Sequence, residues 1–409
     1  MEGINYLRNL LALKQSRINT RYDFYEMKNI FRDLKVFKKS NVDINTIVGW
    51  CPKAVDSLAD RLHFKGWEND NFNLSNIFKM NNQDILFDSA ILSALITGCS
   101  FIYISEDESG YPRLEVIDGR NATGIIDPVT NLLKEGYAVL ERDPKSGHPT
   151  LEAYFETGRT TFYPTPGEPY IIENSAPAPL LAPVINRPDS KRPLGHSRLS
   201  RAMMSITEAA VRVVRRSEIS SEFYSWPQRY LVGTDPDAES IDSVKATMST
   251  MLEITADADG NKPTIGQFPQ ASMTPYTDQI RAFASLFAGE TGLTMTDLGF
   301  PSDNPASAEA IKASHESLRV LTEKSQRTFG ACFLNVGYLA ACIRDRFPYQ
   351  RRQFYLTKAV WYPAFKPDAS ALSVIGDGAI KINQAVPGYF DESNLEKLTG
   401  IEPTAIEEL

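Results

Sequence analysis

The sequence predicts an α+β fold, in which strands and helices occupy separate stretches of the chain. Short apolar or alternating runs separated by Gly, Pro and Asp turns fill residues 99–172, which predicts a mainly β segment. Apolar residues recur at helical spacing before this segment, at 45–62 and 82–97, and again after it, at 199–225. Such separation of strands from helices is typical of α+β architecture.

Two elements of the N-terminal part are expected to be buried. The first is a core-facing helix within 45–62, where Pro52 requires a start or a kink nearby. Its apolar residues at helical spacing are Ile47, Val48, Ala54, Val55, Leu58 and Leu62. The second is the apolar run 85–104, which Asp88 interrupts and whose end is β-branched and aromatic, so we expect a buried helix that turns at Gly98 into a strand and no membrane span.

A proline-rich stretch at 173–197 excludes a regular helix and a central strand, and is expected to be a boundary or an extended crossing segment. The residues that follow, 199–225, predict a long amphipathic helix, which Pro227 ends. One stripe of this helix is apolar, and the other is polar and carries three arginines, Arg212, Arg215 and Arg216.

The region 228–275 is an acidic insert. Two short strands are expected at its ends, in QRYLVG and TIGQFPQ, with a helix from Ser240 to Leu252 between them. Seven acidic and three basic residues leave this insert about four charges negative. Helical periodicity resumes at 276–294.

An irregular segment, Thr296 to Ala306, follows that helix and contains one glycine and two prolines. A new helix is expected to begin with Asn304 as N-cap and Pro305 at its first position, and to run to about Arg344. Residues 329–343 are apolar on every side and predict a buried second half of this helix. A strand is expected at 351–363 and short helices with an acidic end in the tail at 366–409.

Net charge, the N-terminal residues and the cysteines exclude some classes of function without identifying one. A net charge of −8 and a pI near 5.3 argue against a protein whose main task is gripping phosphate. The N-terminus carries no secretory signal, which implies cytoplasmic synthesis. The four cysteines have no metal or redox spacing and are expected to be reduced core residues, Cys51, Cys99, Cys332 and Cys342.

Catalytic and cofactor-binding signatures are missing from the sequence. The chain has no G-x-x-x-x-G-K-[ST] loop for ATP, and its four histidines are scattered without a zinc-binding pair. Ser302-Asp303-Asn304 matches one β-lactamase triplet without its partners, and the calcium-loop-like run at 257–261 has Phe268 where a bidentate Glu belongs. We therefore predict no enzymatic activity and no cofactor or metal.

Three long strings, at 45–67, 194–233 and 305–330, resemble the portal proteins of tailed bacteriophages, especially those of long-tailed siphophages. This resemblance implies a homo-oligomeric ring, usually dodecameric, at one capsid vertex of the virion, assembled in the host cytoplasm. Double-stranded DNA passes through such a ring. A separate terminase drives packaging, and a head-to-tail adaptor docks later. The resemblance also implies major capsid and scaffolding proteins as partners, and no membrane.

The resemblance also implies a division of the chain into parts. It places the N-terminal part of a mixed α/β wing at 1–196, stem helices at 197–225 and 276–294, a small α/β clip at 226–275 and a tunnel loop at 295–306. The long helix behind the loop and a strand returning to the wing would occupy 307–365, and a reduced crown 366–409.

The same mapping implies candidate functional residues. Those of the DNA-facing tunnel loop are Thr296, Asp297, Leu298, Gly299, Phe300, Pro301, Ser302, Asp303 and Asn304. The docking surface of the clip would include Asp235, Asp237, Glu239 and Asp242. Acidic loop residues suit a low-friction conduit for a polyanion, although Asp297 and Asp303 could equally be ordinary turn and cap residues.

Alternatives remain open at this stage. The arginines of 199–225 could contact DNA phosphates or acidic groups of a neighbouring subunit, and we favour the intersubunit contact because it would repeat around a ring. The whole chain could instead be another non-catalytic virion adaptor, or a soluble enzyme with an unrecognised site. An adaptor would not need the order of long helix, loop and long helix.

Overall fold

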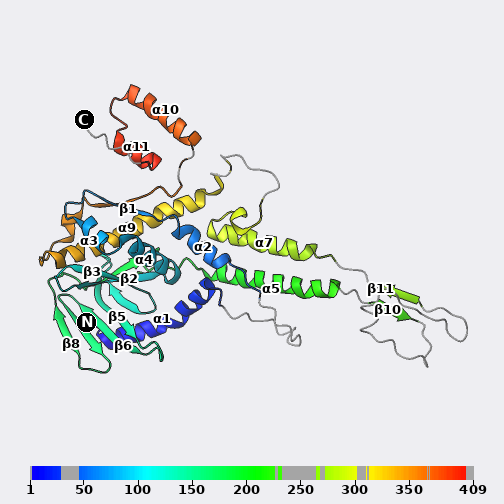
Figure 1. Ribbon diagram of the computed structural model, residues 1–409, viewed down its shortest axis with the longest axis horizontal. Helices are drawn as coiled ribbons and strands as arrows, with labels where there is room; N and C mark the ends of the chain where they lie inside the picture. Colours follow the sequence, from blue (N-terminus) through cyan, green and yellow to red (C-terminus); the bar gives the residue numbers. More distant parts are fainter. Residues whose placement is uncertain are drawn as a thin grey trace, which may run out of the picture.

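The structure, a computed structural model, describes residues 2–28, 46–225, 229–232, 264–267, 272–301, 313–365 and 369–401, together with 310 and 367. Helices and strands occupy separate stretches, so the predicted α+β class is confirmed. An α/β body carries a pair of helices, α5 (Arg201–Ser225) and α7 (Thr274–Thr291), which project from it (Figure 1). Two C-terminal helices, α10 (Ala369–Ala385) and α11 (Glu392–Thr399), lie at the side of the body and confirm the short helices expected there.

The predicted β segment forms two antiparallel sheets. The five-stranded sheet is a meander in sequence order, and its strands are β4 (Ala122–Ile126), β5 (Leu133–Arg142), β6 (Pro149–Glu156), β7 (Arg159–Pro164) and β8 (Tyr170–Glu173). The smaller sheet has the order β3-β2-β9, from β2 (Cys99–Glu106), β3 (Pro112–Ile117) and β9 (Leu181–Ile185).

Strand β9 corrects the expectation of a boundary or crossing segment at 173–197. All five of its residues are buried, and Pro183 lies opposite Phe101 of β2. A proline is tolerated there because β9 is the edge strand of its sheet, so the missing N–H interrupts no second ladder. The expectation that no central strand forms in this stretch is confirmed.

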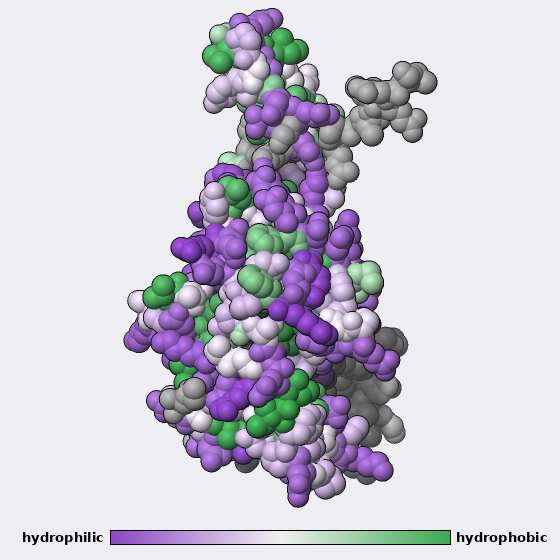
Figure 2. Space-filling model, turned by 90° about the vertical axis from the view of Figure 1, so that its left-hand side faces the viewer, coloured by the Kyte–Doolittle hydropathy of each residue, from purple (hydrophilic) through white to green (hydrophobic). Residues whose placement is uncertain are grey.

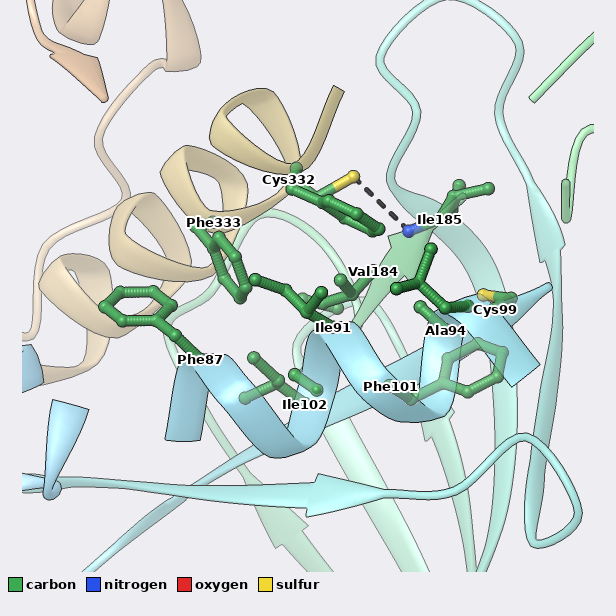
Figure 3. Packing of buried hydrophobic residues seen from close by; sticks show 14 of the residues in the cluster. Phe87, Ile91, Ala94, Cys99, Phe101, Ile102, Val184, Ile185, Cys332 and Phe333 are labelled. Carbon is green, nitrogen blue, oxygen red and sulfur yellow. Dashed lines mark hydrogen bonds between the residues drawn. The ribbon is translucent and has the colours of Figure 1, made fainter. Parts of the chain in front are cut away.

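Two helices pack against the small sheet and form the core: α4 (Gln83–Thr97) and α9 (Glu316–Arg344). The rings of Phe87 and Phe333 lie between them with centroids 4.3 Å apart (Figure 3). Cys332 Sγ accepts from the backbone N–H of Ile185 at 3.5 Å. As predicted, α4 ends at Gly98, whose φ of 106° favours glycine, and the chain passes directly into β2.

The predicted long helix is shorter than expected. Ala310, Ala313 and Ser314 are helical, a turn at His315 interrupts the helix, and α9 then begins at Glu316; its 29 residues span about 43 Å at 1.5 Å per residue. The apolar half at 329–343 is buried almost throughout, as predicted. The predicted N-cap at Asn304 and Pro305 lies outside the described residues.

The remaining helices of the body are α1 (Ile4–Tyr25), α2 (Trp50–Ala59) and α3 (Leu74–Met80). Helix α2 confirms the core-facing helix, with Pro52 in its first turn, whereas Ile47 before it is 57% exposed and not a core residue. Helix α3 was not predicted.

A two-stranded sheet joins distant parts of the chain, β1 (Phe64–Glu68) and β12 (Lys358–Trp361). Within the strand expected at 351–363, only Lys358–Trp361 forms a strand. The first part of that prediction is wrong, because Arg351–Phe354 form a 3-10 turn. Strand β1 was not predicted.

The four cysteines are free and buried, as predicted. In the part of the chain that the structure describes, no helix combines the length and the apolar character that crossing a membrane requires.

Candidate functional site

The projecting helix pair is an antiparallel unit whose register is fixed at both ends. At the end next to the body, the Ser200 hydroxyl donates to Glu290 Oε1 at 2.7 Å. At the far end, the hydroxyls of Ser220 and Tyr276 lie 2.8 Å apart. These contacts, with the close packing of α5 on α7 between them, make the pair one element rather than two independent helices (Figure 1).

A buried arginine attaches this pair to the body. Arg198 donates to the carbonyl oxygen of Ala54 in α2 and to that of Thr291, the last residue of α7. The last carbonyls of a helix have no partner within the helix, and a cation there also matches the helix dipole. Burial, with a smaller contribution from nearby Arg187, lowers the pKa of Arg198 to about 10.

Side chains of α2 hold both helices of the pair from the body side. The rings of Trp50 and Phe287 of α7 have centroids 5.4 Å apart. Cys51 Sγ lies 3.3 Å from the hydroxyl of Thr207 in α5. Sequence reasoning missed the role of Arg198, since no periodicity marks a buried charge that bonds only to distant backbone.

Of the three arginines predicted on α5, Arg215 and Arg216 are adjacent and lie about one turn after Arg212. Arg212 lies 4.0 Å from Glu208, one turn earlier in the same helix. Arg215 and Arg216 are half-buried. The spacing of 212, 215 and 216 places them on one side of α5, where they add positive charge to the helix pair.

The segment after α7 is an ordered turn over its first residues. Helix α7 ends at Gly292, and Asp297 then accepts from the backbone N–H and the hydroxyl of Thr294, both at 2.8 Å. In return, the backbone N–H of Asp297 donates to the Thr294 hydroxyl at 3.1 Å. Asp297 thus serves as a turn residue, the alternative that the sequence left open.

Residues Thr296–Leu298 form a short 3-10 turn that ends at Gly299, whose φ is 89°. Leu298 is only 8% exposed, and Phe300 is partly buried against the core, so both apolar side chains pack on the body. Pro301 is exposed. The rest of the predicted loop, Ser302, Asp303 and Asn304, lies outside the described residues.

His315 lies across from this turn, at the start of α9. Its Nδ1 is 4.0 Å from Asp297 Oδ2, and its ring centroid is 5.8 Å from that of Phe365. The sequence marked His315 only as one of four scattered histidines. The contact joins the turn after α7 to the residue that precedes α9.

The acidic insert is described only at its two strands. β10 (Arg229–Val232) and β11 (Thr264–Gln267) pair antiparallel at the far end of the helix pair, which confirms both predicted strand segments (Figure 1). The predicted helix at 240–252 lies outside the described residues, and so do Asp235, Asp237, Glu239 and Asp242. Among the residues that are described, no group of three or more His, Cys, Asp or Glu side chains could hold a metal ion.

Comparison of the sequence with known proteins finds relatives among phage proteins. The chain is 29% identical over 325 residues to the portal protein of Mycobacterium phage D29, a match that covers 72% of this chain and 64% of the relative. It is 27% identical over 310 residues to the portal protein of Mycobacterium phage L5, covering 70% and 63%. The resemblance to portal proteins is thus confirmed, and the chain spans less than two thirds of the length of these relatives. No family model matches the chain.

Solved structures with a similar arrangement belong to gene transfer agent particles. The native particle's virion matches with a TM-score of 0.44 at 15% identity, covering 87% of this chain and 90% of the other. The neck of the native particle, computed with C12 symmetry, matches with a TM-score of 0.47 at 14% identity and the same coverage.

Proposed function

We propose that this chain, which is related in sequence to phage portal proteins, is itself a portal subunit of a virion. Copies of it would form a ring at a unique capsid vertex, through which DNA enters during packaging and leaves during ejection. The observation that carries the proposal is the projecting antiparallel helix pair, seated on the body through Arg198 and followed directly by the turn at Thr296–Leu298. Arranged side by side around an axis, such pairs form the wall of a channel.

The parts of a portal subunit are proposed at the positions given by the resemblance. The body up to residue 196 is the wing, α5 and α7 are the stem, 226–275 is the clip and 295–306 the tunnel loop. The long helix and the returning strand occupy 307–365, with β12 pairing with β1 of the wing. The C-terminal helices are a reduced crown.

Exposed apolar surface supports assembly into a ring. The side chains on and just after α10 include several large apolar groups that are more than 40% exposed: Val374, Ile380, Ile382, Val386 and Tyr389. Figure 2 shows apolar residues among those at the top of the molecule, where these helices lie. Such surface in a single chain is typical of an interface between proteins, and neighbouring copies in a ring would cover it.

The net charge of −8 supports a conduit rather than a DNA-gripping protein. Each phosphate contact to Lys or Arg would have to break for DNA to move, so weak binding keeps the path open. No catalytic residue is required of this chain, because a separate terminase would drive packaging. The further partners that we propose are a head-to-tail adaptor and the capsid and scaffolding proteins, and the proposed ring is a dodecamer.

The native mass and symmetry of the purified chain test this proposal. Mass photometry and electron microscopy are expected to find closed rings with a central channel, near twelve subunits. A chain that stays a monomer or a dimer under every assembly condition, including the presence of scaffolding protein, would contradict the proposal.

A further inference from the structure

A pocket of about 440 Å³ lies between α1, the start of β2 and the loop at 192–195. Four cationic side chains line it: Lys14, Arg17, Arg21 and Arg192. Among the described residues that line it, none carries a carboxylate. The loop at 192–195 lies just before α5 in the chain, but the proposed portal function makes no use of the pocket.

Lys14 and Arg21 are the more deeply placed cations, and neither is paired with an acid in the described part of the chain. Lys14 Nζ donates to the hydroxyl of Thr123 at 2.8 Å, and Arg21 Nη1 donates to the carbonyl oxygen of Thr97 at 2.7 Å. Arg21 Nε is buried and has no hydrogen-bond partner among the described residues. The described part of the protein therefore leaves one donor of this guanidinium unsatisfied.

The charges in this pocket repel one another. Burial, with a smaller contribution from Arg17, lowers the pKa of Lys14 to about 8. Burial likewise lowers the pKa of Arg21 to about 10, with Arg17, Arg192 and Arg201 adding to the effect. Like charges held together away from water are costly, and an anion among them removes most of that cost.

We propose that this pocket binds one oxyanion, of phosphate or carboxylate chemistry, between Lys14, Arg21, Arg17 and Arg192. Arginine suits such a ligand because its planar fork of N–H donors matches two oxygens at once. The apolar part of the lining, including Leu10, Ile18 and Phe101, makes the surroundings of the charges less polar than bulk water and so strengthens each contact. The inference does not depend on the portal function.

Two sources could supply this chemistry, a free phosphate ion or a carboxylate side chain of a neighbouring copy. The chain carries 51 Asp and Glu against 43 Lys and Arg, so a copy has acidic groups to offer. The binding experiment addresses the site itself, and a separate measurement of assembly distinguishes the sources.

The test titrates inorganic phosphate, and separately acetate, into the unassembled full-length chain by calorimetry at constant ionic strength. The double variant R17Q/R192Q removes two cations of the pocket whose side chains are exposed, so the fold should not depend on them. We expect saturable binding of at least one of the two ions to the unchanged chain and at least tenfold weaker binding to this variant. The control variant R113Q/R352Q removes two exposed arginines outside the pocket and should bind as tightly as the unchanged chain.

Absence of saturable binding of both ions, or equal affinities in R17Q/R192Q and the unchanged chain, would overturn the proposal. Where binding is lost as expected, ring formation by the same variants identifies the source. A lower ring fraction for R17Q/R192Q than for the control assigns the oxyanion to a carboxylate of a neighbouring copy. An unchanged ring fraction assigns it to a free ion.

Discussion

Arg198 donates a hydrogen bond to the carbonyl oxygen of Thr291, and this contact joins the base of α5 to the end of α7. The same guanidinium bonds to the carbonyl oxygen of Ala54, so three helices meet at one side chain. Because the helix pair projects from the body, the contacts at its base determine how the pair is oriented on the body. The orientation of the helix pair on the body therefore depends on a buried side chain that bonds only to backbone carbonyl oxygens.

Replacing Arg198 with Met should destabilise the chain by about 2 kcal/mol, because two buried carbonyl groups lose a charged donor while the cost of burying the charge is relieved. Urea denaturation measures the loss. The variant R201M removes an exposed arginine next to it and should change the free energy of unfolding by less than about 0.5 kcal/mol. Equal stability of R198M and R201M would show that Arg198 does not anchor the pair.

The tunnel loop can be tested without damage to the turn that supports it. Leu298 and Phe300 pack into the core, so deletion of the whole segment 296–306 would destabilise the body. Replacing only residues 301–304 with Gly and Ser should leave rings intact, since Pro301 is exposed. We expect such rings to package DNA poorly in an assay with terminase, and normal packaging would contradict the assignment of the loop.

Local patterns predicted the elements that depend on local chemistry. Gly98 ends α4 because its backbone adopts a positive φ, and the apolar half of α9 is buried because it has no polar side. Contacts between distant segments left no such signal. The prolines of 173–197 argued against a central strand, and no local pattern showed that the residues around Pro183 would pair with β2 as an edge strand.

The candidate functional residues show the same difference between local patterns, which the sequence reveals, and contacts between distant segments, which it does not. The three arginines of α5 were predictable because they share one helix, whereas the pocket brings together Lys14 and Arg21 of α1 with Arg192, more than 170 residues away along the chain. The burial of Leu298 was missed for a similar reason. A segment that looks irregular in sequence can still contribute a side chain to the core.

Lys14 should make stability depend on pH in a defined direction. Its pKa is lowered to about 8 in the folded chain from 10.5, so between these values the unfolded chain binds more protons and stability rises with pH. The gain is bounded at about 3 kcal/mol and should be nearer 1 to 2, because the side chain is only partly buried.

The variant K14M isolates this effect in phosphate-free buffer. It should be more stable than the unchanged chain at pH 7, and the difference should shrink between pH 8 and 10.5 as folded Lys14 loses its charge. Urea denaturation at pH 7, 9 and 10.5 measures both. A difference that stays constant over this range would mean that Lys14 is not buried as a cation.

Charge reversal on α5 separates the two roles left open for its arginines. If Arg216 contacts acidic groups of a neighbouring copy, R216E should lower the ring fraction measured by light scattering, most strongly at low salt, because the new like-charge contact is then least screened. If Arg216 instead contacts DNA, R216E rings should form normally and fail only in packaging. R352E, a reversal at an exposed site on the body, serves as the control for added negative charge. We expect the first result, because a polar contact between copies repeats at every interface of a ring, whereas a strong phosphate contact would hinder moving DNA.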